Sequence, residues 1–359
     1  MAGVSLPRSP ALPLAAREAT WRENMTTALL GLWTVLGLFL DGWAHENLGG
    51  LETFFTPWHG ALYSGLAASI LWNGWLVTKR WLAGARGRAA VPPGYLIGIV
   101  GLTLFGAGGF ADLLWHSAFG IERSIDALLS PPHLAMFFGA VLGLTSPLRA
   151  AWAADDAEHQ PDFLILLPVL LTTALLSSVV AFFFMYLSVF TNGEVSGSRL
   201  GARFTFADGM RTYNQQTGIA SILVTNVVLF TPVLFLLRRW VLPAGATTLL
   251  VSLPAILVGA VRELAYWPAV LGVVVGALAT ELLLRLLQPS AGRMWRYRLF
   301  AALAPTLLWA FYFLAVWLTR GVVWTRELTL GLVIWTGLSG LALSVLIIPP
   351  PAGQPPRSA

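Results

Sequence analysis

The stretch "MTTALLGLWTVLGLFLDGWAHENLGGLETFFTPWH", residues 25–59, decides the fold. Its first part, residues 25–40, contains no charged side chain, and an apolar run of about 20 residues suffices to span a bilayer as a helix. Its second part carries the ionisable side chains Asp41, His45, Glu46, Glu52 and His59. The stretch therefore predicts a transmembrane helix that ends in a cluster of ionisable groups.

The whole chain has the composition of an integral membrane protein. Of its 359 residues 57% are hydrophobic and only 11% are charged, and the mean hydropathy is +0.73. We therefore predict an all-α polytopic membrane protein with about ten transmembrane helices. The expected spans are residues 25–45, 58–78, 94–116, 132–148, 163–190, 217–237, 241–260, 266–287, 299–318 and 328–348.

The basic residues predict the orientation of these helices. The first apolar run ends in "DGWAH" and not in a small-residue cleavage site, so we expect the first helix to stay as an anchor. With the N-terminus inside, 15 of the 22 basic residues fall in inner segments, as the positive-inside rule requires. The expected location is the cell membrane, with the ionisable cluster toward the outer face. The net charge of +5 follows from this topology, so no nucleic-acid partner is expected.

The same segments predict the organisation of the chain. We expect a cytoplasmic tail (1–24), two repeated helical hairpins (25–148), a six-helix membrane scaffold (149–348) and a C-terminal tail (349–359). The polar connection 191–216 is the candidate lid or docking element.

The hairpins are predicted from an internal repeat. An Asp-x3-His motif with an indole inside it ends the first and the third predicted helix. A Thr-Pro or Ser-Pro motif followed by His opens the second and the fourth, and Gly comes six residues after that His. The repeated residues are Asp41, Trp43, His45, His59 and Gly65 in the first copy and Asp112, Trp115, His116, His133 and Gly139 in the second. Two parallel repeats are expected to carry their ionisable groups at the same end.

The repeated residue types are those of metal sites. Residues four apart share a helix face, and a Pro at the first helical position places the later His in the first turn, beside the preceding helix end. Ionisable residues at membrane depth are costly and usually functional. The predicted metal ligands are Asp41, His45 and His59 in one site and Asp112, His116 and His133 in the other. Each Asp–His pair could instead form a local hydrogen bond, and His159 is expected to be solvated.

Other residues complete this prediction. The chain has no cysteine, which excludes disulfides, thiolate metal sites, iron–sulfur clusters and covalent haem. Glu52 and Glu122, in the loops between ligands, are expected to hydrogen-bond the ligands or handle protons. Side-by-side packing of the hairpins would bring the six ligands together and favours a paired centre.

The segment "DGWAHENLGGLETFFTPWH" (41–59) resembles the metal-site segment of the C subunit of copper membrane monooxygenases, the particulate methane and ammonia monooxygenase family. That family has Asp-x3-His-x12-His, with a Trp near the first His and "FTPSH" at the second. Here the motif ends in "FTPWH", the gap between the His residues is thirteen, and the duplicate has sixteen. The resemblance implies that Asp41, His45 and His59 bind copper, and that the subunit works with partner membrane subunits.

Three functions remain open at this stage. The first is a copper-dependent monooxygenase-like subunit that oxidises a small apolar substrate arriving through lipid. The second is transport or handling of a transition metal, for which zinc or iron would suit the ligands as well as copper. The third is a structural membrane protein with hydrogen-bonded Asp–His clusters. The expected surroundings are the lipid bilayer and either partner subunits or further copies of the chain.

Overall fold

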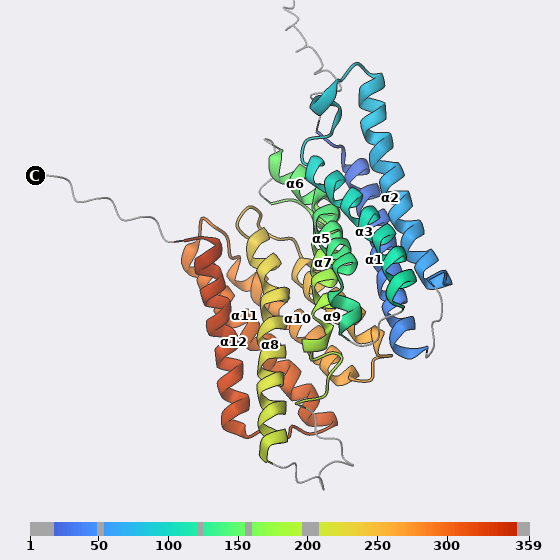
Figure 1. Ribbon diagram of the computed structural model, residues 1–359. Coiled ribbons are helices and arrows are strands. Elements are labelled where there is room, and N and C mark those ends of the chain that lie inside the picture. Colours follow the sequence, from blue (N-terminus) through green and yellow to red (C-terminus); the bar gives the residue numbers. More distant parts are fainter. Residues whose placement is uncertain (1–17, 49–53, 121–124, 155–159, 196–207, 350–359) are drawn as a thin grey trace, which may run out of the picture.

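The computed structural model describes residues 18–48, 54–120, 125–154, 160–195 and 208–349, and it is all-α in these ranges, with no β-strand (Figure 1). The first seven α-helices are α1 (Trp21–Asn47), α2 (Pro57–Leu82), α3 (Leu96–Phe119), α4 (Asp126–Leu129), α5 (Pro131–Leu144), α6 (Ser146–Ala153) and α7 (Phe163–Phe183). The others are α8 (Asp208–Leu236), α9 (Ala246–Val261), α10 (Trp267–Leu287), α11 (Met294–Thr319) and α12 (Arg326–Ile347). Two 3-10 turns lie at η2 (Gly87–Ala90) and η3 (Met185–Leu187).

Eight helices in the described ranges are long and apolar enough to cross a membrane, which supports a polytopic membrane protein. The ten predicted spans each contain a helix, but α2 and α9 are not among these eight. The α9 helix has only 16 residues. The α2 helix has 26 residues but carries Asn73 in its interior and Lys79 and Arg80 in its last turn.

One predicted helix boundary is wrong, and one predicted span consists of two joined helices. The predicted span 163–190 ends as a helix at Phe183, because side chains beyond it bind backbone groups that a helix would use. The Thr191 hydroxyl donates to the Met185 carbonyl at 2.6 Å, and the Phe190 N–H donates to the Ser188 hydroxyl at 3.2 Å. The predicted span 132–148 lies within one apolar helical stretch, Pro131–Ala153, which is counted among the eight; its two parts, α5 and α6, meet at Thr145, just before Pro147, which lacks a backbone N–H.

The N-terminal part consists of two antiparallel helix pairs, α1 with α2 and α3 with α5 (Figure 1). In the first pair the backbones touch at glycines. A Cβ on Gly37 would lie 2.6 Å from Leu62 Cα, and a Cβ on Gly65 would lie 2.7 Å from the Thr34 nitrogen. Small residues allow membrane helices to approach closely. This contact brings the end of α1 against the start of α2.

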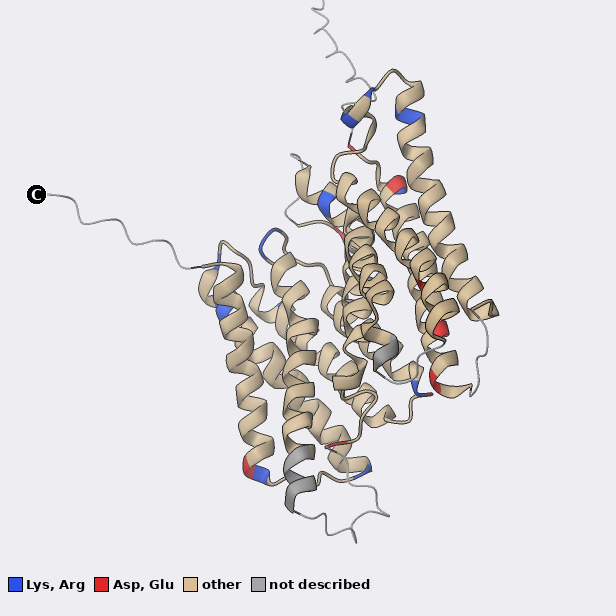
Figure 2. Cartoon of the chain, in the orientation of Figure 1, with Lys and Arg blue, Asp and Glu red and all other residues tan. Residues whose placement is uncertain are grey.

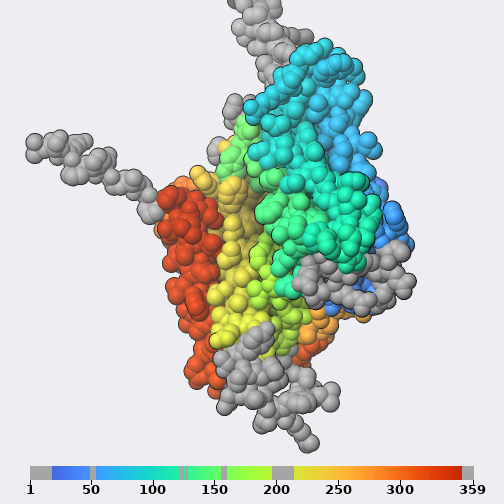
Figure 3. Space-filling view, viewed as in Figure 1, coloured from blue at the N-terminus to red at the C-terminus, as the bar shows by residue number. Residues whose placement is uncertain are grey.

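The six helices α7–α12 form the other part, and α7 joins the two parts. The α7 helix packs on α1 and α5 on one side and on α8 and α9 on the other, and one hydrophobic core runs through both parts. Figure 3 shows the two parts in continuous contact. Most charged side chains lie near helix ends and in loops, and the middle of the bundle is almost free of them (Figure 2).

We expect Gly65→Val to destabilise the protein, because the added side chain meets the backbone of Thr34, which cannot rotate away. Overpacking of this kind costs about 1–3 kcal/mol. The measurement is the midpoint of thermal unfolding in detergent.

Gly74→Val is the matched control, since Gly74 lies in the same helix and a Cβ there meets nothing within 4 Å. Equal losses in the two variants would mean that helix propensity, and not the close contact, sets the effect.

Candidate metal sites

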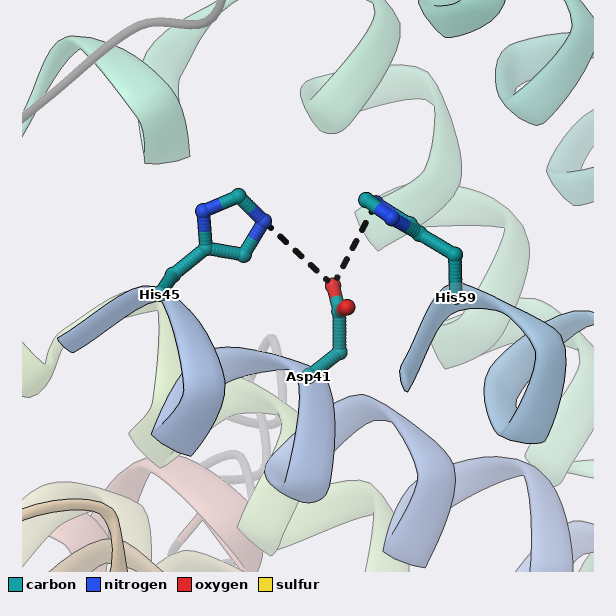
Figure 4. Close-up of side chains that lie close together, drawn as sticks. All are labelled: Asp41, His45 and His59. Atoms are coloured by element: carbon teal, nitrogen blue, oxygen red, sulfur yellow. Dashed lines mark ion pairs between the residues drawn. The ribbon is translucent and has the colours of Figure 1, made fainter. Parts of the chain in front are cut away.

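The six predicted ligands gather in two separate triads. Asp41 and His45 lie in the last two turns of α1, and His59 lies in the first turn of α2. Asp112 and His116 lie in the last turns of α3, and His133 in the first turn of α5. Within each triad one donor atom per residue lies within 4.8 Å of the others. Figure 4 shows the first triad, with both imidazoles directed at the Asp41 carboxylate.

The distances in both triads are similar. The Asp41 Oδ2 atom lies 3.8 Å from His45 Nε2 and 3.5 Å from His59 Nε2. The Asp112 Oδ1 atom lies 3.3 Å from His116 Nε2 and 3.6 Å from His133 Nε2. Each carboxylate therefore faces two imidazoles through the same type of nitrogen.

These separations fit ligands of one ion. Nitrogen and oxygen ligands bind zinc-like ions at about 2.0–2.2 Å, and tetrahedral angles then separate the donor atoms by about 3.3–3.6 Å. In addition, Asp41 Oδ1 is buried and has no hydrogen-bond partner among the described residues. A buried carboxylate oxygen without a donor is costly, and a cation would satisfy it.

The protonation of His116 strengthens this argument. Its Nδ1 lies 3.1 Å from the Gly120 carbonyl oxygen, which can only accept, so Nδ1 carries a proton. In the neutral ring Nε2 then presents a lone pair to Asp112 Oδ1. Two acceptors at 3.3 Å repel each other unless a positive charge stands between them. That charge is either a proton, carried by the ring or by the carboxyl group, or a metal ion.

The later His of each triad is oriented in the same way. His59 Nδ1 lies 3.0 Å from the Thr56 hydroxyl, and His133 Nδ1 lies 2.6 Å from the Ser130 hydroxyl. Thr56 is also the N-cap of α2, accepting from the His59 backbone N–H, as the sequence predicts. Ser130 has the N-cap position of α5, but its hydroxyl makes no cap bond. A hydrogen bond on Nδ1 that leaves Nε2 for the metal is the usual arrangement of a metal-bound imidazole.

Aromatic side chains surround the triads. The Phe54 ring stacks on His59 at 4.8 Å between centroids and lies 6.3 Å from His116. The Tyr63 ring also stacks on His59, with 6.1 Å between the ring centroids. The Tyr63 hydroxyl lies 3.6 Å from the Met136 sulfur. The two triads are thus neighbours with aromatic contacts between them. Phe54 contacts an imidazole of each triad, and the paired centre stays a prediction.

The triads differ in exposure. In the first, the side chains of Asp41 and His45 are 12% and 31% exposed. In the second, those of Asp112 and His116 are 1% and 7% exposed. The first triad is therefore more accessible to solvent than the second.

Other residues near the triads were not all predicted. Glu52 and Glu122, expected beside the ligands, lie outside the described residues, as does His159. Glu46 forms an ion pair with Arg262 at 2.7 Å, which fixes the end of α1 to the end of α9. The roles of Thr56 and Ser130 as His partners were missed, although both lie three residues before a His in the sequence.

In comparisons with known proteins, no family model, no curated protein and no solved structure matches the chain.

Proposed function

We propose that this protein is a membrane-embedded metal-binding protein in which each triad holds one transition metal ion. The observation that carries this proposal is the convergence, in both triads, of one buried carboxylate and two imidazole Nε2 atoms at 3.3–3.8 Å. One carboxylate cannot neutralise two imidazolium groups, so protonation of both rings would leave a buried excess charge. A single metal ion serves all three groups.

We further propose that the protein is a copper-dependent monooxygenase-like subunit acting on a small apolar substrate. The support is the resemblance of residues 41–59 to the copper site of the membrane monooxygenases, together with the ligand set. Carboxylate and imidazole ligands alone would also suit zinc or iron. Three protein ligands leave a coordination position open, and a bound copper ion there would supply dioxygen chemistry.

The residues of the chain prepare the site for this role. The Nδ1 partners of His59 and His133 hold the two imidazoles with Nε2 directed at the carboxylate. Phe54 and Tyr63 stack on His59 and give this side of the first triad an apolar surface. Apolar surroundings at a helix end within the bilayer suit a substrate that dissolves in lipid.

We also infer that the two hairpins are copies of one unit, because their glycine contacts correspond. Counted from the Asp ligand, Gly37 and Gly108 both lie four residues earlier. The first meets Leu62 and the second meets Met136, each three residues after the later His. The contacts at close range are therefore repeated together with the ligands.

A second pair of contacts repeats in the same way. Gly65 and Gly139 both lie six residues after the later His. A Cβ on Gly65 would meet Thr34, and a Cβ on Gly139 would lie 2.5 Å from the Phe105 nitrogen, each seven residues before the Asp ligand. Independent helix pairs have no reason to share both spacings.

The alternative function is capture or handling of a transition metal, and the exposed His45 of the first triad favours it. Transport across the membrane receives less support from the polar residues inside the helices. The Glu281 carboxylate accepts the backbone N–H groups of Gly245 and Thr247, and Asn226 is bonded to Trp309 and Ser339. These groups stabilise helix contacts and do not continue a path from the triads.

The first prediction concerns metal content. Protein purified and loaded with copper should hold one ion per triad, and His45→Ala and His116→Ala should each lose one of the two ions. Elemental analysis after desalting measures this. His159→Ala is the control, because the sequence predicts a solvated residue that belongs to neither repeated motif. Wild-type protein that stays metal-free after loading with copper, zinc and iron in turn would refute the sites.

The second prediction concerns catalysis. Copper-loaded protein in lipid nanodiscs, supplied with a quinol and ¹⁸O₂, should insert labelled oxygen into a small alkene such as propene. The product is identified by mass spectrometry. Its yield should fall at least tenfold in whichever of the variants His45→Ala and His116→Ala loses the copper ion that reacts with dioxygen. Full copper occupancy without any labelled product would favour metal handling over oxidation.

The third prediction concerns orientation, which we propose places both triads toward the outer face and the N-terminus inside. Since the chain has no cysteine, single cysteines report cleanly. Asn47→Cys, at the triad end of α1, should react with an impermeant thiol reagent in intact cells. Ala89→Cys, at the opposite end of the bundle, should react only after lysis. The reverse pattern would invert the proposed topology.

A further inference from the structure

A second candidate site lies at the opposite end of the bundle from the triads. A pocket of about 450 Å³ is formed by the end of α6, the segment that follows α8 and the connection between α10 and α11. Its polar and aromatic lining residues include Trp152, Arg238, Arg239, Trp240 and Ser290. None of these residues takes part in the triads.

The Arg239 guanidinium is held in a fixed position in this pocket. Its centre lies 5.6 Å from the ring centroids of both Trp152 and Trp240, and one terminal nitrogen donates to the Ala154 carbonyl at 2.9 Å. Its Nε atom is buried and has no hydrogen-bond partner among the described residues. A buried charged donor without an acceptor is costly, so the pocket favours a ligand that brings one.

The surroundings of the pocket favour an anion. Arg238 is exposed at its rim, and the neighbouring connection and helix ends carry Arg285, Arg293, Arg296 and Arg298. The one described carboxylate on α10, Glu281, is engaged by the backbone at the start of α9 and pairs with Arg285 at 3.6 Å, so the unpaired excess of positive charge comes from the other arginines. A positive potential is therefore expected at this end of the scaffold.

The level of the pocket favours a lipid. It lies where α8 and α10 end and α11 begins, which is the depth of lipid headgroups if these helices span the membrane. Trp side chains prefer this boundary. The apolar side chains of Leu286 and Trp295, at the flanking helix ends, are 71% and 63% exposed and offer surface for acyl chains.

We propose that this pocket binds the phosphate of an anionic phospholipid. The planar guanidinium of Arg239 donates to the phosphate oxygens, and Arg238 adds charge at the rim. The acyl chains lie along the exposed apolar side chains beside the pocket. Basic pockets between membrane helices bind anionic headgroups by the same combination of charge and depth. The site is independent of the metal proposal.

The test is a lipid titration of delipidated full-length protein, followed by native mass spectrometry. Phosphatidylglycerol should bind with clear preference over phosphatidylcholine. Arg239→Gln and Arg238→Gln should each weaken phosphatidylglycerol binding by about fivefold, the effect of one basic residue at a membrane surface. Arg326→Gln, at the start of α12 on the other end of the scaffold, is the matched control and should bind as the wild type does.

Several results would overturn the proposal. Arg239 also contacts Ala154 and two Trp rings, so Arg239→Gln could fail to fold for structural reasons. In that case Arg238→Gln, a change at the exposed rim, is the variant that tests the proposal. Unchanged binding in Arg238→Gln would then refute the site. Inorganic phosphate that displaces phosphatidylglycerol at millimolar concentration would identify a free-anion site instead. Asp155 and Asp156 follow Ala154 in the sequence. If phosphatidylglycerol binds only after both are replaced by Asn, the chain's own carboxylates exclude the lipid and the proposal is wrong.

Discussion

The burial of the Asp112 carboxylate between two imidazoles is the constraint on which the N-terminal part depends. Its side chain is 1% exposed, and a carboxylate removed from water costs several kcal/mol unless positive charge and hydrogen bonds replace the solvent. The end of α3 and the start of α5 must therefore stay in contact at His116 and His133. The same requirement holds in milder form for Asp41, which is 12% exposed. If the end of the first helix of a pair moved away from the start of the second, the buried carboxylate would lose the contact with the later His of its triad.

Local patterns explain what could be predicted from the sequence. The 3.6-residue period places Asp41 beside His45, and a Pro at the helix start places His59 in the first turn, so each triad follows from spacing within a single hairpin. The end of α7 at Phe183 could not be predicted in the same way. It depends on side-chain bonds to the backbone that compete with helix continuation over a few residues, in a segment whose hydropathy is uniform.

Contacts between distant segments were beyond sequence reasoning. Arg262 pairs with Glu46, more than two hundred residues earlier in the chain, which is brought near by the packing of α1 against α9. The contact of Phe54 with both triads also depends on tertiary packing, since this ring lies near an imidazole from each hairpin. The repeat in the sequence shows that the Asp and His residues recur, but it contains no information on the distance between the two copies.

The hairpins touch each other directly through α2 and α3, and both also rest on α7. Two adjacent residues of this helix hold one hairpin each: Phe182 packs edge-on against Phe39 at 5.1 Å, and Phe183 packs against Phe137 at 4.5 Å. A Cβ on Gly42, next to Asp41, would lie 2.4 Å from the Phe182 ring, so the contact is tight at the position beside the ligand. Phe137 lies one turn after His133 on α5. Because both rings belong to one apolar helix of the scaffold, the scaffold helps to fix the two triads relative to each other, and a change at either Phe would move one carboxylate–imidazole cluster without altering any of its ligands.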